Sequence, residues 1–207
     1  MKTLNAPGWF AAHAAVRTDS YVMLASLLGQ TPSEELLNIL RNLHWDDVVP
    51  EKQSHALEAL RRAAHDYSPA DLEGEFNQLF IGLGSGEMVP YASWYLEKKI
   101  QSTPLASLRS DLTELGIVRQ TGCHESEDHA GALCEIMAII SQKPNDIPHA
   151  DQSKFFHRHI SPWMMTFFQD LQTAKSTGFY RMVGLFGGCF LETESEYLKP
   201  GCKYPFS

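Results

Sequence analysis

The sequence predicts an all-α fold, a single globular helical domain of about eight or nine helices around one core. Three helix-start signals support this: Ser or Thr followed by Pro stands before amphipathic runs at 31–43, 68–80 and 103–116. The alternation of apolar and polar residues that marks a half-buried strand is absent, as is an Asn-Gly hairpin turn. No repeat or low-complexity linker divides the 207 residues, so one domain is expected over 1–207.

Four helices are expected in the first part of the chain, near residues 9–29, 31–43, 51–66 and 68–80. Thr31 is the expected N-cap of the second, with Pro32 at its first position and Glu34 closing a capping box. Ser68 and Asp71 repeat this arrangement before the fourth helix. Local capping chemistry therefore predicts where these helices begin.

Further helices are expected near residues 91–99, 103–116, 127–140, 151–160, 161–171 and 178–198. Gly116 is placed to end one of them as a C-terminal glycine cap. Glu127 and Asp128 are expected in the first helical turn, where acidic groups are favourable. Ser161 and Pro162 are expected to end one helix and start the next.

The longest breaks between expected helices are 82–90 and 117–127. The second is the candidate hinge between two helical halves. Because hinge loops permit domain swapping, both a monomer and a domain-swapped dimer are compatible with this organisation.

Composition and charge exclude several classes of protein. The formal charge of 17 − 25 = −8 disfavours nucleic acid and would attract a basic partner. The four widely spaced cysteines form no C-x-x-C pair, which fits reduced thiols in the cytosol. The N-terminus is a poor signal peptide, and no run reaches the roughly 18 apolar residues of a membrane span. We therefore expect a cytoplasmic protein without an integral membrane segment.

Motifs for catalysis or for a cofactor are missing from the chain. There is no H-E-x-x-H, and His124 and His129 are five apart, which is not one helical face. The "GLGSGE" stretch lacks the Lys-Ser/Thr of a phosphate-binding loop, and no G-x-S-x-G elbow is present. No catalytic residue, metal ligand or cofactor is assigned. A histidine-based metalloenzyme built from distant segments is kept as an alternative.

Three stretches set an acidic or polar group beside aromatic residues. They are "EFNQLFIGLGSGEMVPYASWY" (75–95), "ESEDH" (125–129), and the region from "HISPW" (159–163) to "GFYRMVGLFGGCFLETESE" (178–196). In this order they resemble the motifs of the TorD/DmsD family of cytoplasmic chaperones for molybdenum-cofactor oxidoreductases exported by the twin-arginine pathway. Two prolines of the family pattern are replaced, by Leu83 and Ser126, which loosens a turn but leaves the carboxylates and aromatic residues in place.

The resemblance implies two partners: a twin-arginine signal peptide and the immature catalytic subunit of a molybdoenzyme, held until its cofactor is inserted. An S-oxide or N-oxide reductase is the expected client, with tetrathionate, selenate or formate enzymes as alternatives. A nitrate-reductase-type assembly chaperone, whose client has no export signal, is the neighbouring alternative. Such a binding protein would not be an enzyme.

A receptor for such a peptide needs carboxylates for the guanidinium groups and an apolar groove for the rest. The candidate carboxylates are Glu125, Glu127 and Asp128. The candidate groove residues are Leu79, Phe80, Pro90, Tyr91, Trp94 and Tyr95. By resemblance, the peptide-binding positions of the family correspond to Leu79, Phe80, Pro90, Tyr91, Ser93, Tyr95, Asp128 and His129. Glycines 82, 84 and 86 would let the loop adapt.

Each candidate also has a structural interpretation. Leu79 and Phe80 lie at the buried end of a helix, which favours the core over a groove. The structural interpretation of Asp128 is that it only stabilises the N-terminus of its own helix. His129, in the same first turn, is expected to be a neutral ring with one hydrogen bond. The acidic run from Glu192 to Glu196 is expected to be a solvated helix end.

Overall fold

The computed structural model describes residues 6–45, 49–82, 86–98, 103–118 and 125–199. Within these ranges it contains ten α-helices and one π-helical turn, and no strand. They are α1 (Ala6–Gly29), α2 (Glu34–Arg41), α3 (Glu51–Asp66), α4 (Pro69–Phe76), η1 (Asn77–Ile81), α5 (Ala92–Glu97), α6 (Thr103–Glu114), α7 (Ala130–Gln142), α8 (His149–His159), α9 (Met164–Thr173) and α10 (Phe179–Tyr197). The predicted all-α class is confirmed, with a helix count close to the expected one.

Local capping explains where several helices begin and end. Ser68 accepts from the Asp71 amide and Asp71 from the Ser68 amide, so the predicted capping box of α4 is confirmed. Gly116 has a φ of 67° at the end of α6, which fits its predicted role. The predicted start of α2 was wrong: its cap is Ser33, whose hydroxyl accepts from the Leu36 amide at 3.2 Å.

Two other predicted helix starts were also wrong. Residues 161–163 form a turn, and α9 begins only at Met164. Glu127 and Asp128 precede α7 instead of lying in its first turn, since His129 is the N-cap. The candidate hinge near 117–127 falls largely on residues 119–124, which lie outside the described residues.

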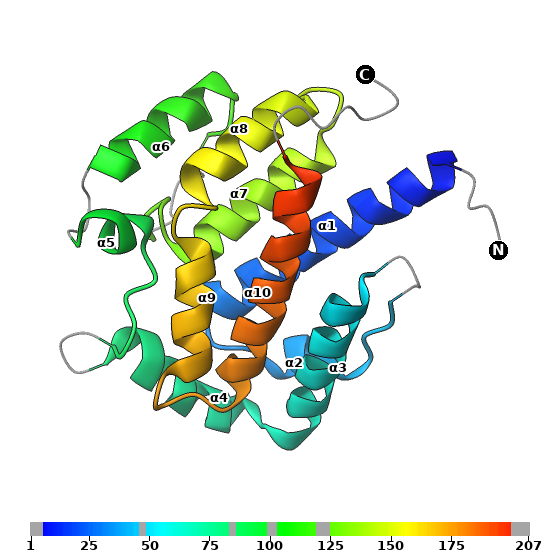
Figure 1. Ribbon diagram of the computed structural model, residues 1–207. Helices are drawn as coiled ribbons and strands as arrows, with labels where there is room; N and C mark the ends of the chain where they lie inside the picture. Colours follow the sequence, from blue (N-terminus) through cyan, green and yellow to red (C-terminus); the bar gives the residue numbers. More distant parts are fainter. Residues whose placement is uncertain (1–5, 46–48, 83–85, 99–102, 119–124, 200–207) are drawn as a thin grey trace.

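Helix α10, the last of the described helices, runs through the middle of the molecule (Figure 1). It packs against α3 and α9, while α1 packs mainly against α7. The contact with α9 is close: a Cβ at Gly187 would lie 2.4 Å from the Phe168 ring. The side chains of Trp163 and Phe179 are buried among the large aromatic residues of the core.

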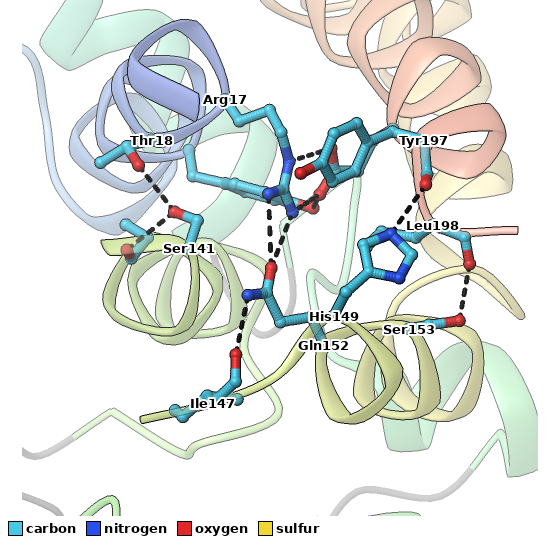
Figure 2. A network of polar contacts seen from close by, with 12 residues as sticks. Arg17, Thr18, Ser141, Ile147, His149, Gln152, Ser153, Tyr197 and Leu198 are labelled. Atoms are coloured by element: carbon cyan, nitrogen blue, oxygen red, sulfur yellow. Dashed lines mark hydrogen bonds and ion pairs between the residues drawn. The ribbon is translucent and has the colours of Figure 1, made fainter. Parts of the chain in front are cut away.

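A buried polar network fastens α1 to α8 and α10 (Figure 2). The Arg17 guanidinium donates from Nε and Nη2 to the two carboxylate oxygens of Glu194, each at 2.7 Å. It also donates to Gln152 Oε1 at 3.3 Å and lies 4.0 Å from the centre of the Tyr197 ring. The prediction of a solvated helix end was therefore wrong for Glu194, which is 1% exposed.

The start of α10 is fixed by a carboxylate from the first motif. Glu75 of α4 accepts from the backbone amides of Gly178, Phe179 and Tyr180 at 2.8, 3.1 and 2.7 Å. These amides have no partner within their own helix, and a carboxylate at a helix N-terminus is favourable. The first acidic residue of the motif therefore joins α4 to α10.

Candidate functional site

The two principal motifs meet at one short backbone junction. Tyr91 and His129 form an isolated antiparallel bridge, in which the Ala92 amide donates to the Asp128 carbonyl at 2.9 Å. The Ala130 amide donates to the Pro90 carbonyl at 2.8 Å. The starts of α5 and α7 are thereby held side by side, although Tyr91 and His129 lie 38 positions apart in sequence.

Asp128 supports this junction from inside. Its side chain is completely buried, and its Oδ2 accepts from the Ser93 amide at 3.1 Å. Its Oδ1 accepts from the Ser126 hydroxyl at 2.6 Å. Asp128 therefore caps α5 and not the helix that follows it in sequence. Ser93 is also fully buried, and its hydroxyl has no hydrogen-bond partner in the described part of the chain.

His129 caps the neighbouring helix with its ring. Nδ1 accepts from the Gly131 amide at 3.1 Å, and the ring packs edge-on against Tyr91 with centroids 5.1 Å apart. Burial lowers the pKa of His129, although the carboxylates of Glu125 and Asp128 act in the opposite direction. A ring nitrogen that accepts from an amide and a lowered pKa both fit the expected neutral ring with one hydrogen bond.

Because the pKa of His129 is lowered, we expect the folded protein to lose stability in mild acid. Because its pKa is lower in the folded chain than the ordinary value of about 6.5, the unfolded chain binds more protons below that pH. The contribution of His129 to stability is complete above about pH 6.5 and falls by at most about 1.4 kcal/mol per pH unit below it. His129→Asn keeps an acceptor for the Gly131 amide but cannot be protonated.

Urea unfolding at pH 7.5 and 5.5, compared between the wild-type chain and His129→Asn, measures this effect. The variant is expected to lose less stability between the two pH values than the wild-type chain. Equal losses would show that protonation of this ring does not contribute.

The exposed side of the junction carries aromatic and acidic groups. The Tyr91 hydroxyl donates to Glu125, and the Tyr95 hydroxyl donates to Asp170 of α9 at 2.9 Å. Burial, together with the carboxylate that each hydroxyl contacts, raises the pKa of both tyrosines above the usual value. Trp94 is 36% exposed. This face of α5 combines aromatic surface with negative charge.

Glu127 is engaged with a neighbouring helix. Its two carboxylate oxygens accept from Nε and Nη2 of Arg109 on α6, at 3.1 and 2.9 Å. A guanidinium group thus already occupies this predicted acceptor within the chain itself. For an arginine from a peptide, the exposed Glu125 is the more accessible carboxylate.

Leu79 and Phe80 lie apart from the junction's hydrogen bonds. Leu79 is completely buried in the core. Phe80 is half-buried and packs edge-on against Phe76 and Tyr180, with ring centroids 5.0 and 5.4 Å apart. Their interpretation as core residues fits these contacts, and a peptide cannot touch Leu79 in this conformation.

The described glycines of the loop have a backbone requirement that the sequence interpretation did not identify. Gly82 has a φ of 50°, and a Cβ at Gly86 would lie 2.4 Å from the Leu79 carbonyl oxygen. Gly84 lies outside the described residues. Next to Gly86, the Glu87 carboxylate accepts from the amides of Lys175 and Ser176, which anchors the end of the loop to the connection before α10.

Sequence reasoning missed a pocket on the other side of α5. It has a volume of about 210 Å³ and lies between α5, α6, α8 and the start of α7. Arg158 and His159 line it, both of which contact Asp111 of α6. Among the sequence motifs, His159 is the first residue of "HISPW", and Arg158 belongs to none of them. Their position depends on how α6 packs against α8, for which the sequence contains no local signal.

Two further observations concern the described residues. They contain no group of three or more His, Cys, Asp or Glu side chains arranged to hold a metal ion. Within the same ranges, no helix is long and apolar enough to cross a membrane. His124 lies outside the described residues.

Comparisons with known proteins agree with the resemblance seen in the motifs. A family model described as the nitrate reductase delta subunit matches residues 46–169. Chaperone protein TorD of Vibrio cholerae serotype O1 is 24% identical over 202 residues, covering 88% of this chain and 91% of that protein. A Haemophilus influenzae protein named "Probable Tat proofreading chaperone DmsD" is 29% identical over 113 residues, 54% of each chain.

One solved structure supports the fold. The crystal structure of a protein assigned to redox enzyme maturation in Archaeoglobus fulgidus superposes with a TM-score of 0.58 at 18% identity. The match covers 84% of this chain and 93% of that one. At this level of identity the likeness extends to the fold alone.

Proposed function

The chain belongs to the nitrate reductase delta subunit family, and on that premise we propose that it is a chaperone for the maturation of a redox enzyme and not itself an enzyme. Relatives in this comparison are named as TorD and DmsD chaperones, one of them as a Tat proofreading chaperone. We place its action in the cytoplasm, where an immature redox enzyme is found before export.

In finer terms, the proposed ligand is a twin-arginine signal peptide of a molybdenum-cofactor oxidoreductase of the S-oxide or N-oxide reductase type. One observation carries this proposal: the bridge between Tyr91 and His129 brings both motifs to one corner of the molecule. There Tyr91 and Glu125 are accessible to a ligand. The buried Asp128 fixes the segments that carry them, through its hydrogen bonds with Ser93 and Ser126. Carboxylate and rigid aromatic surface side by side suit an arginine followed by apolar residues.

Isothermal titration of the protein with a synthetic peptide containing Arg-Arg and an apolar stretch tests this function. We expect a Kd between nanomolar and micromolar, which added salt weakens because charges are paired in the complex. A peptide with Lys-Lys in place of Arg-Arg is the matched control. It keeps the charge but not the planar fork of the guanidinium, so it is expected to bind more weakly.

The proposal fails if the two peptides bind equally, or if neither binds. A second candidate function is favoured by the description of the matching family model, namely assembly of a nitrate-reductase-type client that has no export signal. Purification of the chain from its native cell, with the bound subunit identified by mass, separates the two functions. A client with a twin-arginine signal supports the first, and one without it supports the second.

A further inference from the structure

The pocket beside α5 is distinct from the aromatic face on which the proposed peptide contacts lie. Its walls come from α5, α6, α7 and α8, which gather at one end of the molecule (Figure 1). The apolar walls are formed by Ala92, Leu96, Pro104, Leu108 and Leu133. Apart from Asp128, none of the residues that line this pocket was among the candidate peptide-binding residues.

Four polar side chains of the pocket wall, those of Arg158, Ser107, His159 and Asp128, are hydrogen-bonded to other protein groups. Arg158 donates from Nη1 to both oxygens of Asp111, each at 2.9 Å, and from Nη2 to the Ser107 hydroxyl at 2.8 Å. His159 Nε2 contacts the same carboxylate at 2.6 Å. Both oxygens of Asp128 are also hydrogen-bonded. The surface that remains for an occupant is therefore mainly apolar.

The volume of about 210 Å³ limits what the pocket can hold. An apolar cavity of about 150 Å³ accepts a benzene molecule, whereas pockets for drug-sized ligands and cofactors are about 300–1,000 Å³. One leucine or phenylalanine side chain therefore fits the space, and a nucleotide does not.

Position and charge indicate where this side chain comes from. Asp128 both lines the pocket and supports the Tyr91–His129 junction, so the pocket adjoins the corner where the arginines are proposed to bind. Glu97, an exposed residue, also lines the pocket. An occupant that belongs to a positively charged segment is favoured by this carboxylate and by the formal charge of −8.

We propose that the pocket between α5 and α6 accepts one large apolar side chain of the client peptide, from the apolar stretch next to its arginines. This inference rests on the proposed function, since it assigns a subsite for the same ligand. It adds a subsite for one apolar side chain on the side of α5 opposite the face proposed for the arginines and the aromatic contacts.

A series of peptides in which each apolar residue is replaced in turn by Ala tests the subsite. With the wild-type protein, one position is expected to weaken binding by about 10-fold to 100-fold, as expected for burial of one Leu or Phe side chain. In a Thr103→Trp variant, the indole covers the pocket from an exposed position in its lining. This variant is expected to bind the unmodified peptide about 10-fold more weakly and to lose the dependence on that position.

Thr113→Trp is the matched control, because Thr113 is an exposed threonine of the same helix that does not line the pocket. It is expected to behave as the wild-type protein. The inference is overturned if Thr103→Trp keeps the wild-type dependence, or if both variants weaken binding equally. Should Thr103→Trp fail to fold, Leu96→Ala, which removes an exposed wall of the pocket, is expected to reduce the effect at the same position.

Cross-linking locates the side chain directly. A peptide with photo-leucine at the sensitive position is expected to label residues of α5 or α6, and labelling of α4 or α10 instead would overturn the inference. Failure of the pocket leaves Arg-Arg binding by the wild-type protein intact. Failure of the proposed function is a different result, because the wild-type protein then does not bind the Arg-Arg peptide or binds the Lys-Lys peptide equally well.

Discussion

Glu194→Gln is expected to destabilise the folded protein by about 3–5 kcal/mol, the cost of removing one partner from a buried ion pair. Arg17 and Glu194 are 6% and 1% exposed, so water cannot replace the lost charge. Burial alone lowers the pKa of Arg17, and the Glu194 carboxylate raises it to a net value above the usual one. Because an arginine side chain is not deprotonated in proteins, the guanidinium stays charged in the variant and is left without its carboxylate.

Urea unfolding measures this loss as a decrease in the midpoint at unchanged slope. Glu192→Gln is the matched control on the same helix, because Glu192 pairs with Lys52 at 3.2 Å in an exposed position. That change is expected to cost no more than about 1 kcal/mol. A double variant, Arg17→Met with Glu194→Leu, is expected to regain most of the stability, since no buried charge is left unpaired.

Equal stabilities of Glu194→Gln and Glu192→Gln would contradict this account of the network. A double variant as unstable as the single one would show that packing around the pair, and not the unpaired charge, dominates the cost.

Asp128→Ala is expected to weaken binding of the Arg-Arg peptide by about 30-fold to 100-fold, or about 2–3 kcal/mol. Asp128 is completely buried, so the effect is expected to act through the position of α5 and not through a contact with the peptide. The variant leaves the Ser93 amide and the Ser126 hydroxyl without their acceptor. The cost of a buried unsatisfied donor is about 1–3 kcal/mol, so stability is expected to fall as well.

Glu125→Gln is the informative comparison, because Glu125 is exposed. It is expected to weaken binding and reduce its dependence on salt, with little change in the midpoint of unfolding. Titration calorimetry at two salt concentrations, together with urea unfolding, distinguishes a positioning residue from a contact residue. Asp128→Ala with wild-type affinity would refute the role of the junction.

Interactions within one helical turn could be predicted from sequence. The capping box of Ser68 and Asp71 and the glycine cap at Gly116 depend only on neighbours in the chain, and both were predicted correctly. The start of α2 was missed by two residues because Thr31 and Ser33 both have capping side chains. Sequence alone cannot rank two such caps that lie so close together.

The candidate site was only partly predictable, because it depends on contacts between segments that are distant in the sequence. The motifs marked the segments around Tyr91 and Asp128, but not the bridge that joins them or the burial of Asp128. The large apolar and aromatic residues of the first motif divide between the core, for Leu79, and a partly exposed face, for Tyr91 and Trp94. Their division depends on which side of each segment meets a neighbouring helix.

The sequence by itself determined the all-α class, most helix positions and the motifs that indicate the family, because helical periodicity and capping are local properties. Tertiary structure decided the partner of each charged group. Glu194 looked like part of a solvated helix end, and only the packing of α1 brings Arg17 to it from 177 residues away. The pocket beside α5 likewise exists only where four helices meet, because a cavity is a property of packed surfaces and not of any one segment.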